Sequence, residues 1–332
     1  AYQIVKQALQ NGKHVVTANK KMLAENLEGI FQLQQQHDRS VLYEGAVCGS
    51  IPILRNLEEY YDNDLISGIE GIFNGSTNYI LTKVFEERRN YADALRQAQE
   101  LGFAESDPSL DVKGFDPKFK LAIAITHAFG VFVKPEDMLN IGINNINDLD
   151  LKFAREKGYG IKLIARAIKS ENRVFGLVAP QFIDAHHLLS SVRNEYNAVT
   201  VQGAFSEKQL FIGKGAGSYP TGSAVLSDIS ALTYDYRYEY KKLHQAEDLQ
   251  YSTQASIEAF VRFPHGTKIS IQDFEEFQSG YAANGQHYML GRVSLEKLAE
   301  WSRWENVGII LSPEAQFVSR KAINEFVQYS AA

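Results

Sequence analysis

The sequence predicts an α/β protein built from three units. Its 332 residues, 45% of them hydrophobic, are enough for a large core and for more than one domain. Strand-like and helix-like segments alternate near the start of the chain and alternate again toward its end. We expect the units to cover residues 1–57 together with 209–232, residues 58–208, and residues 233–332.

The first unit is expected to contain a parallel pair of strands. Ala1–Leu9 is amphipathic, and because the chain opens inside this helix without an initiator methionine, we expect it to be trimmed at its N-terminus. His14–Thr17 and Val41–Glu44 are short apolar runs typical of buried strands. The helical segment Met22–Gln36 lies between them, and a helix that joins two strands is typical of parallel pairing.

The second unit is expected to combine strands with two helices around a polar loop. Its strand-like runs are Leu65–Phe73, Val174–Val178 and Ala198–Gln202. The first helix ends at Gly102, which can adopt the left-handed conformation that terminates helices. The second helix begins at Asp116-Pro117, where the aspartate can cap free amides and the proline fits the first helical position.

The polar loop and helix start, residues 102–120, contain four carboxylates, Glu105, Asp107, Asp111 and Asp116, and end at Lys120. Lys120 follows Asp116 by one helical turn, and the rest of its helix is apolar on nearly all sides. A lysine at such a position can give or take a proton where a core opens toward a polar site. The alternative is a solvated loop with a surface ion pair. The aspartates lack the alternating spacing of a calcium loop, and Asp107, which precedes a proline, favours a structural turn.

A glycine-rich turn, Gly213–Ser218, follows the strand-like run Gln209–Ile212 and precedes the helical segment Thr221–Leu232. These are the elements of a phosphate-binding loop, although Ser218 stands where the dinucleotide-binding fingerprint has its last glycine. A glycine-rich turn between a strand and a helix also occurs in many proteins where it binds no phosphate.

The third unit is expected to be a small α+β module. It starts with a linker rich in tyrosine and charge, YDYRYEYKK. Strand-like and helix-like segments then alternate in the order SIEAFVRF, SIQDFEEFQ, YMLGRV, SLEKLAEWSRW and VGIILSP, of which the second and fourth are expected to be helices.

Composition excludes several classes of protein. The net charge of -6, without a basic cluster, argues against nucleic-acid binding. No apolar run approaches the ~20 residues of a membrane-spanning helix, so no membrane partner is expected. Cys48 is the single cysteine, which suits a reducing cytoplasm, and we expect no nucleophilic role for it. The pair His186-His187 lacks further residues at metal-ligand spacing.

Five segments, in order, are similar to the homoserine dehydrogenase family. They are GKHVVTANK (Gly12–Lys20), YEGAVCGSIPI (Tyr43–Ile53), GIFNGSTNYIL (Gly71–Leu81), ELGFAESDPSLDVKGFDPKFK (Glu100–Lys120) and GKGAGSYPTGSAVLSDI (Gly213–Ile229). The resemblance covers about Ala1 to Leu232.

The resemblance implies a role for each unit. Residues 1–57 and 209–232 would form part of a Rossmann-type NAD(P)-binding domain whose glycine-rich half precedes the chain. Residues 58–208 would form the substrate and dimerisation domain of a cytoplasmic homodimer. The order of elements in residues 233–332 is similar to the ACT-type regulatory modules fused to many members of this family.

The implied reaction is the NAD(P)-dependent interconversion of L-aspartate 4-semialdehyde and L-homoserine, in threonine, methionine and isoleucine biosynthesis. Lys120 matches the acid/base of the family, and Asp116 would orient it. Burial lowers the pKa of a lysine and a carboxylate raises it, and both outcomes stay open at this point. Glu105 matches the residue that binds the amino end of the substrate, with Asp111 alongside. Lys20 matches a lysine at the boundary between nicotinamide and substrate.

The resemblance also implies cofactor and cation contacts. Gly102 and Gly217 are expected near the cofactor, as is Lys20. Glu44, with the carbonyls of Val47, Gly49 and Ile51, is expected to hold a monovalent cation, usually sodium. The alternative is that Glu44 caps the helix that starts at Pro52.

Two other functions stay open. One is a related dehydrogenase of another small amino or hydroxy acid, and the other is a non-catalytic amino-acid-binding regulatory protein. Because the pyrophosphate turn is expected to precede Ala1, the trimmed chain is predicted to keep its substrate pocket and to lose most of its affinity for a dinucleotide.

Overall fold

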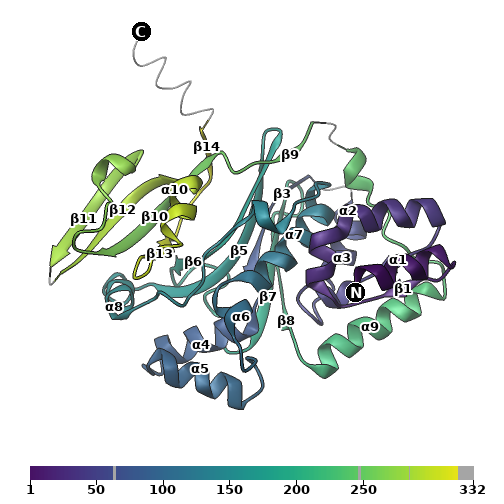
Figure 1. Ribbon diagram of the computed structural model, residues 1–332, viewed down its shortest axis with the longest axis horizontal. Helices are drawn as coiled ribbons and strands as arrows, with labels where there is room; N and C mark the ends of the chain where they lie inside the picture. Colours follow the sequence, from purple (N-terminus) through teal and green to yellow (C-terminus); the bar gives the residue numbers. More distant parts are fainter. Residues whose placement is uncertain (63–64, 246–247, 284, 321–332) are drawn as a thin grey trace, which may run out of the picture.

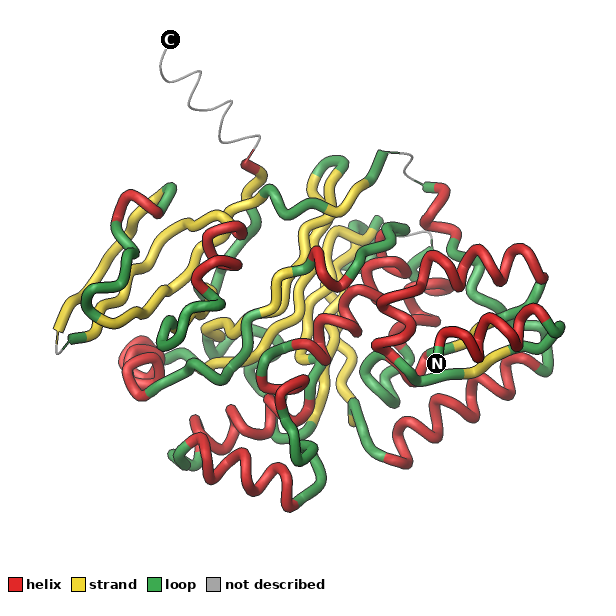
Figure 2. Tube along the Cα trace, in the orientation of Figure 1, coloured by secondary structure: helices red, strands yellow, loops and turns green. Residues whose placement is uncertain are grey.

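The computed structural model describes residues 1–62, 65–245, 248–283 and 285–320 (Figure 1). Two sheets organise these residues, a parallel pair β1-β2 and a 12-stranded sheet whose main order is β11-β12-β10-β13-β6-β5-β3-β7-β8. Helices of the N-terminal residues gather at one end of the molecule and the C-terminal strands lie at the other (Figure 2). No described helix is both long and apolar enough to cross a bilayer.

The N-terminal unit has the parallel pairing that its sequence predicts. Its elements are α1 (Tyr2–Gln10), β1 (Val15–Val16), α2 (Lys20–His37), β2 (Val41–Leu42), η1 (Glu44–Ala46), α3 (Ile53–Arg55) and η2 (Asn56–Tyr60). β1 pairs with β2 in parallel, with Val15 opposite Val41. α1 buries Val5 and Leu9, whereas Ile4 on the same helix is exposed, so the apolar face is narrower than the sequence pattern indicates.

The middle of the chain forms a mostly antiparallel sheet covered by helices, in which the short β4 pairs with β6 in parallel. The strands are β3 (Ile66–Ile72), β4 (Leu139–Asn140), β5 (Gly160–Ser170), β6 (Arg173–Ile183), β7 (Tyr196–Gly203) and β8 (Lys208–Lys214). The helices are α4 (Gly75–Glu86), α5 (Tyr91–Glu100), α6 (Ser109–Val112), α7 (Phe115–Phe129), η3 (Pro135–Asp137) and α8 (Asp148–Lys157). α4 packs against β5 and β7, and α7 packs against β3, β5 and β6.

The return of the chain to the N-terminal unit starts later than the expected Gln209. Residues 208–214 form β8, which pairs with β7 at the edge of the large sheet. Within residues 209–232, it is α9 (Ser218–Leu232) that returns, and it packs against η1 and β1. The reason is that β7 and β8 form a hairpin joined by a short turn, which keeps the second strand in the sheet of the first.

The C-terminal strands continue the large sheet. They are β9 (Gln250–Tyr251), β10 (Ala255–Pro264), β11 (Glu276–Ala283), β12 (Gln286–Ser294), β13 (Gly308–Leu311) and β14 (Val318–Ser319), together with η4 (Lys241–His244), η5 (Ile271–Asp273) and α10 (Leu295–Trp301). β10 pairs with β12 and β13, and β13 meets β6 at Leu311 and Gln181.

Two expectations for this region are wrong. The segment SIQDFEEFQ is not a helix, because the Ser270–Asp273 capping box starts only the short turn η5 and the chain then enters β11. The segment YDYRYEYKK is not an exposed linker, because Tyr238 and Tyr240 are buried. Tyr236, Tyr238 and Tyr240 contact the N-terminal unit, while Tyr234, Arg237 and Glu239 are exposed.

Candidate active site

Helix α7 carries the central ion pair. The helix starts after Gly114, whose φ of 79° is left-handed, and every residue from Asp116 to Phe129 is buried. Asp116 Oδ2 lies 2.7 Å from Lys120 Nζ, one turn along. Asp116 does not cap the helix as the sequence indicates, since its carboxylate is used by side chains instead. The expected pairing of Asp116 with Lys120 is confirmed.

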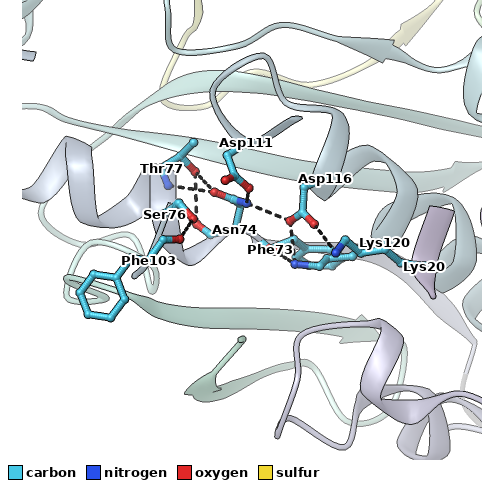
Figure 3. Close-up of polar contacts among 9 residues, drawn as sticks. All are labelled: Lys20, Phe73, Asn74, Ser76, Thr77, Phe103, Asp111, Asp116 and Lys120. Carbon is cyan, nitrogen blue, oxygen red and sulfur yellow. Dashed lines mark hydrogen bonds and ion pairs between the residues drawn. The ribbon is translucent and has the colours of Figure 1, made fainter. Parts of the chain in front are cut away.

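Two further segments meet this pair (Figure 3). Lys20, the first residue of α2, brings its Nζ to 3.1 Å from Asp116 Oδ1. Phe73, which directly follows β3, accepts a hydrogen bond of 2.7 Å from Lys120 Nζ through its backbone carbonyl. The polar atoms therefore come from three places in the sequence, held together where the N-terminal unit contacts the large sheet.

Asn74 is the residue that sequence reasoning missed. Its Nδ2 donates to Asp111 Oδ1 at 2.7 Å and to Asp116 Oδ2 at 2.9 Å, so it joins both aspartates. Its Oδ1 accepts from the Thr77 amide and caps α4. An asparagine between the end of a strand and a helical segment is a typical N-cap, and that signal was present in FNGSTNYIL.

The lysines and Asp116 each stabilise the ionised form of the other. Burial pushes the pKa of Lys120 down, but the Asp116 carboxylate outweighs it, and the pKa of Lys120 is raised above its usual value. Burial pushes the pKa of Asp116 up, but Lys120 and Lys20 outweigh it and hold the pKa below its usual value. Burial and the neighbouring Asp116 raise the pKa of Asp111. The cluster therefore contains a protonated lysine at neutral pH.

The remaining loop residues lie outside this cluster. Glu105 is exposed, and its backbone carbonyl accepts a hydrogen bond from Gln99. Asp107 accepts from the Ser109 amide, which is the turn role that its sequence favours. Gly102 has a φ of 74° just after α5, as expected of a helix end, and it is exposed. The roles of Glu105 in substrate binding and of Gly102 in cofactor binding stay predictions.

Glu44 has the contacts of a helix cap. Its Oε1 accepts from the Leu54 amide at 2.8 Å and its Oε2 from the Arg55 amide at 3.0 Å. Burial raises the pKa of Glu44 to about 7, against the effect of these two amides. The capping alternative is therefore realised at α3, one residue after Pro52.

Two motif loops touch each other through their backbones. Ser50 donates from its amide to the Lys214 carbonyl at 3.1 Å. A β-carbon added to Gly49 would lie 2.7 Å from the Gly215 carbonyl, so glycine is required for this approach. Gly217, with a φ of 111°, precedes α9 and is exposed, and its part in cofactor binding stays a prediction. Cys48, in the first loop, is buried, and burial raises the pKa of its thiol to about 12, which leaves it inert as a nucleophile.

Comparison with known proteins shows the family. The family model described as homoserine dehydrogenase matches residues 52–230, and the model described as the NAD-binding domain of homoserine dehydrogenase matches residues 1–44. The chain belongs to the homoserine dehydrogenase family. The matched range 52–230 includes the positions of Asn74, Asp111, Asp116 and Lys120, and the matched range 1–44 includes that of Lys20.

Relatives named homoserine dehydrogenase match about two thirds of the chain. The protein of Bacillus subtilis is 41% identical over 235 residues, which are 71% of this chain and 54% of that protein. The protein of Neisseria gonorrhoeae is 40% identical over 69% of this chain and 53% of its own length. The matched part of the chain thus spans about half the length of these homoserine dehydrogenases.

Solved structures of homoserine dehydrogenases have the same fold. The homoserine dehydrogenase of Thiobacillus denitrificans is 29% identical with a TM-score of 0.80, over 93% of this chain and 78% of that chain. A hyperthermophilic archaeal homoserine dehydrogenase, solved in complex with NADPH, is 28% identical with a TM-score of 0.62, over 72% of this chain and 69% of that chain. The first of these matches extends into the C-terminal strands.

Proposed function

We propose that the protein is a homoserine dehydrogenase, which interconverts L-aspartate 4-semialdehyde and L-homoserine with NAD(P). Membership of the family supports the reaction class. The observation that carries the proposal is the buried Lys120, charged at neutral pH and held by Asp116 and the Phe73 carbonyl. This is the arrangement that a proton donor to a carbonyl oxygen needs.

In the proposed mechanism a bound nicotinamide supplies the hydride. Lys120 donates a proton from Nζ to the aldehyde oxygen during reduction and takes it back during oxidation. Asp116 keeps the ammonium aimed and charged, since it contacts Lys120 at 2.7 Å. The side chain of Lys20 is 41% exposed, and Lys20 is proposed to contact substrate and cofactor. Asp111 and Glu105 bind the ammonium group of the amino acid.

The proposal for the cofactor rests on the N-terminal unit. The family model of an NAD-binding domain matches residues 1–44, and a related structure was solved with NADPH. Gly217 before α9 and Gly102 after α5 are proposed to lie near this cofactor, and NADP is the proposed form. The protein is further proposed to be a cytoplasmic homodimer that acts in threonine, methionine and isoleucine biosynthesis, as implied by its family.

A monovalent cation, sodium, is proposed beside Glu44. Carboxylate and carbonyl oxygens are ligands that suit a hard cation, and Glu44, Val47, Gly49 and Ile51 offer only such atoms. Each Glu44 carboxylate oxygen accepts one amide and keeps a further lone pair. The raised pKa of this carboxyl supports the proposal, because a nearby cation would stabilise its charged form.

The proposed reaction is tested by following NADPH formation from L-homoserine with the full-length protein. Lys120→Met should lower kcat by about 10²–10⁴-fold, because the proton donor is lost while length and packing are kept. Lys118→Met is the matched control. Lys118 is a second buried lysine of α7, and its Nζ lies over the Phe115 ring at 5.0 Å.

A loss below about tenfold in Lys120→Met would reduce Lys120 to a structural ion pair. Turnover of a different semialdehyde in place of this substrate would favour the related dehydrogenase. Homoserine binding without hydride transfer in the full-length protein would favour a regulatory binding protein.

A further inference from the structure

Asn74 has every hydrogen-bonding atom of its side chain in use. It is 4% exposed. Its two amide hydrogens go to Asp111 Oδ1 and Asp116 Oδ2. Its Oδ1 accepts from both the amide and the hydroxyl of Thr77, each at 2.8 Å. A side-chain amide offers two donors and an oxygen with two lone pairs, so this one is fully satisfied.

These four contacts allow a single orientation of the amide. If the group turned over, its oxygen would face two carboxylates and its nitrogen would face the Thr77 amide hydrogen (Figure 3). The backbone is equally constrained, because a β-carbon on Gly75 would lie 2.5 Å from the Glu195 carbonyl. The turn after β3 therefore cannot move away from β7 without losing this close approach.

The same turn contacts both members of the ion pair. Phe73 gives its carbonyl to Lys120 and Asn74 gives its amide to Asp116. Asn74 also separates Asp116 from Asp111, two carboxylates whose negative charges raise each other's cost of burial. A neutral double donor between them supplies one hydrogen bond to each and adds no charge.

We propose that Asn74 is a positioning residue of the reaction, which fixes Asp111 and Asp116 through one side-chain amide and so aims Lys120 at the substrate. The role rests on the proposed function, in which Lys120 donates the proton. Asn74 acts through Asp116, and a small displacement of a proton donor lowers turnover strongly.

The test uses Asn74→Asp in the full-length protein. Aspartate keeps the size of the side chain and is as good an N-cap as asparagine, so α4 should stay folded. It replaces the double donor by a third carboxylate against Asp111 and Asp116. We expect kcat to fall by about 10–100-fold at pH 9. At pH 6 the new group is partly protonated and can donate one hydrogen bond, so the loss should be smaller there.

Asn90→Asp is the matched control. Asn90 caps α5, and its Nδ2 also donates to an aspartate, Asp93, but Asn90 is exposed and Asp93 is only half-buried. This variant should keep wild-type kcat at both pH values. An equal loss in Asn74→Asp at pH 6 and pH 9, or no loss at all, would overturn the proposal.

A second variant tests the role of Asn74 without a measurement of turnover. Asn74→Ser keeps a capping oxygen but removes the amide that donates to both aspartates, since its single hydroxyl hydrogen can serve at most one of them, and it adds no charge. The hydrogen bond from Asn74 lowers the pKa of Asp111, so carboxyl NMR titration should show this pKa raised in Asn74→Ser. An unchanged Asp111 titration would overturn the positioning role. Wild-type protein that does not oxidise homoserine would instead overturn the proposed function, while the titration still decides what Asn74 does.

Discussion

Asp116 and Glu44 are both buried carboxylates, but their partners shift their pKa values in opposite directions. Asp116 contacts two lysines, which lower its pKa despite burial. Glu44 has two backbone amides, and the guanidinium of Arg55 binds Asp228 at 2.6 Å instead. Its pKa rises to about 7 because two neutral donors do not offset the loss of water.

The raised pKa of Glu44 predicts that stability falls as pH rises. Between the usual pKa of 4.5 and about 7, the folded protein binds more protons at Glu44 than the unfolded chain does. The free energy of unfolding should therefore decrease over this range by up to about 3 kcal/mol from this group. Urea unfolding from pH 5 to pH 8 in sodium-free buffer measures it, and Glu44→Gln should remove this part of the slope.

The same variant tests the cation. At pH 8, sodium chloride should raise the midpoint of thermal unfolding of the wild type more than choline chloride at equal ionic strength does. Glu44→Gln should respond to both salts alike. An identical response of the wild type to the two salts would argue against a sodium site at Glu44.

Single residues were predictable where the interaction is local. The Asp116–Lys120 pair follows from a spacing of four in a helix, and Asp107 follows from its turn. Asn74 lies far from Asp111 and Asp116 in the sequence, so no local pattern shows that they meet. The sequence indicates two roles for Glu44, because a helix cap and a cation site use the same carboxylate oxygens.

At the scale of elements, the segment 234–240 joins the N-terminal unit to α7, and we call it the tyrosine strap. Tyr240 lies 2.6 Å from Tyr43 between hydroxyl oxygens, and its amide donates to Glu58. Glu58 contacts His127 at 2.5 Å, and Tyr43 contacts the other nitrogen of that ring at 2.9 Å. The strap is held by a buried network of hydrogen bonds.

Tyr240→Phe should lower the free energy of unfolding by about 1–3 kcal/mol, because the buried hydroxyl of Tyr43 and the amide of Gln34 lose a partner. Chemical denaturation measures this change. Tyr234→Phe, at a strap position that is 64% exposed, should change stability little. Equal effects of the two substitutions would mean that the network contributes nothing.

The strap and the segment SIQDFEEFQ show why the structure of some elements differs from the sequence prediction. Its tyrosines occupy every second position, which is the pattern of an extended segment with one buried face, but the charges between them favoured a linker. SIQDFEEFQ carries a genuine capping box, and that local signal lost to the pairing of β11 with β12. In both segments, contacts with distant parts of the chain determined the structure.

At the scale of the whole molecule, the C-terminal strands are tied to the centre by a buried ion pair. Arg262 of β10 contacts Asp150 of α8 at 2.8 Å, with both side chains at most 3% exposed. Arg262 also donates to the Asn306 carbonyl. Because β13 meets β6, these strands share one sheet with the elements that carry the candidate site. Local periodicity predicts strands but not their order, so this continuity could not be predicted.

Arg262→Met should lower the free energy of unfolding by about 3–5 kcal/mol, because it leaves the Asp150 charge buried without a partner. Urea unfolding measures the loss. Adding Asp150→Asn should restore part of the stability, since the unpaired charge is then removed. A loss below about 1 kcal/mol for Arg262→Met would indicate that Asp150 is protonated or hydrated in the folded protein.

Helix α7 is contacted at both ends by the N-terminal unit, through Lys20 at Asp116 and through Tyr43 at His127. A helix of its 15 residues is about 22 Å long and stiff. The contacts at Asp116 and His127 are about 17 Å apart along this rod, and they resist any hinge opening across it, because opening would break one of them. The Ser50 amide also donates to the Lys214 carbonyl of β8, so the N-terminal unit is tied to the edge strand of the large sheet as well, and a rotation about the axis of α7 would break that contact.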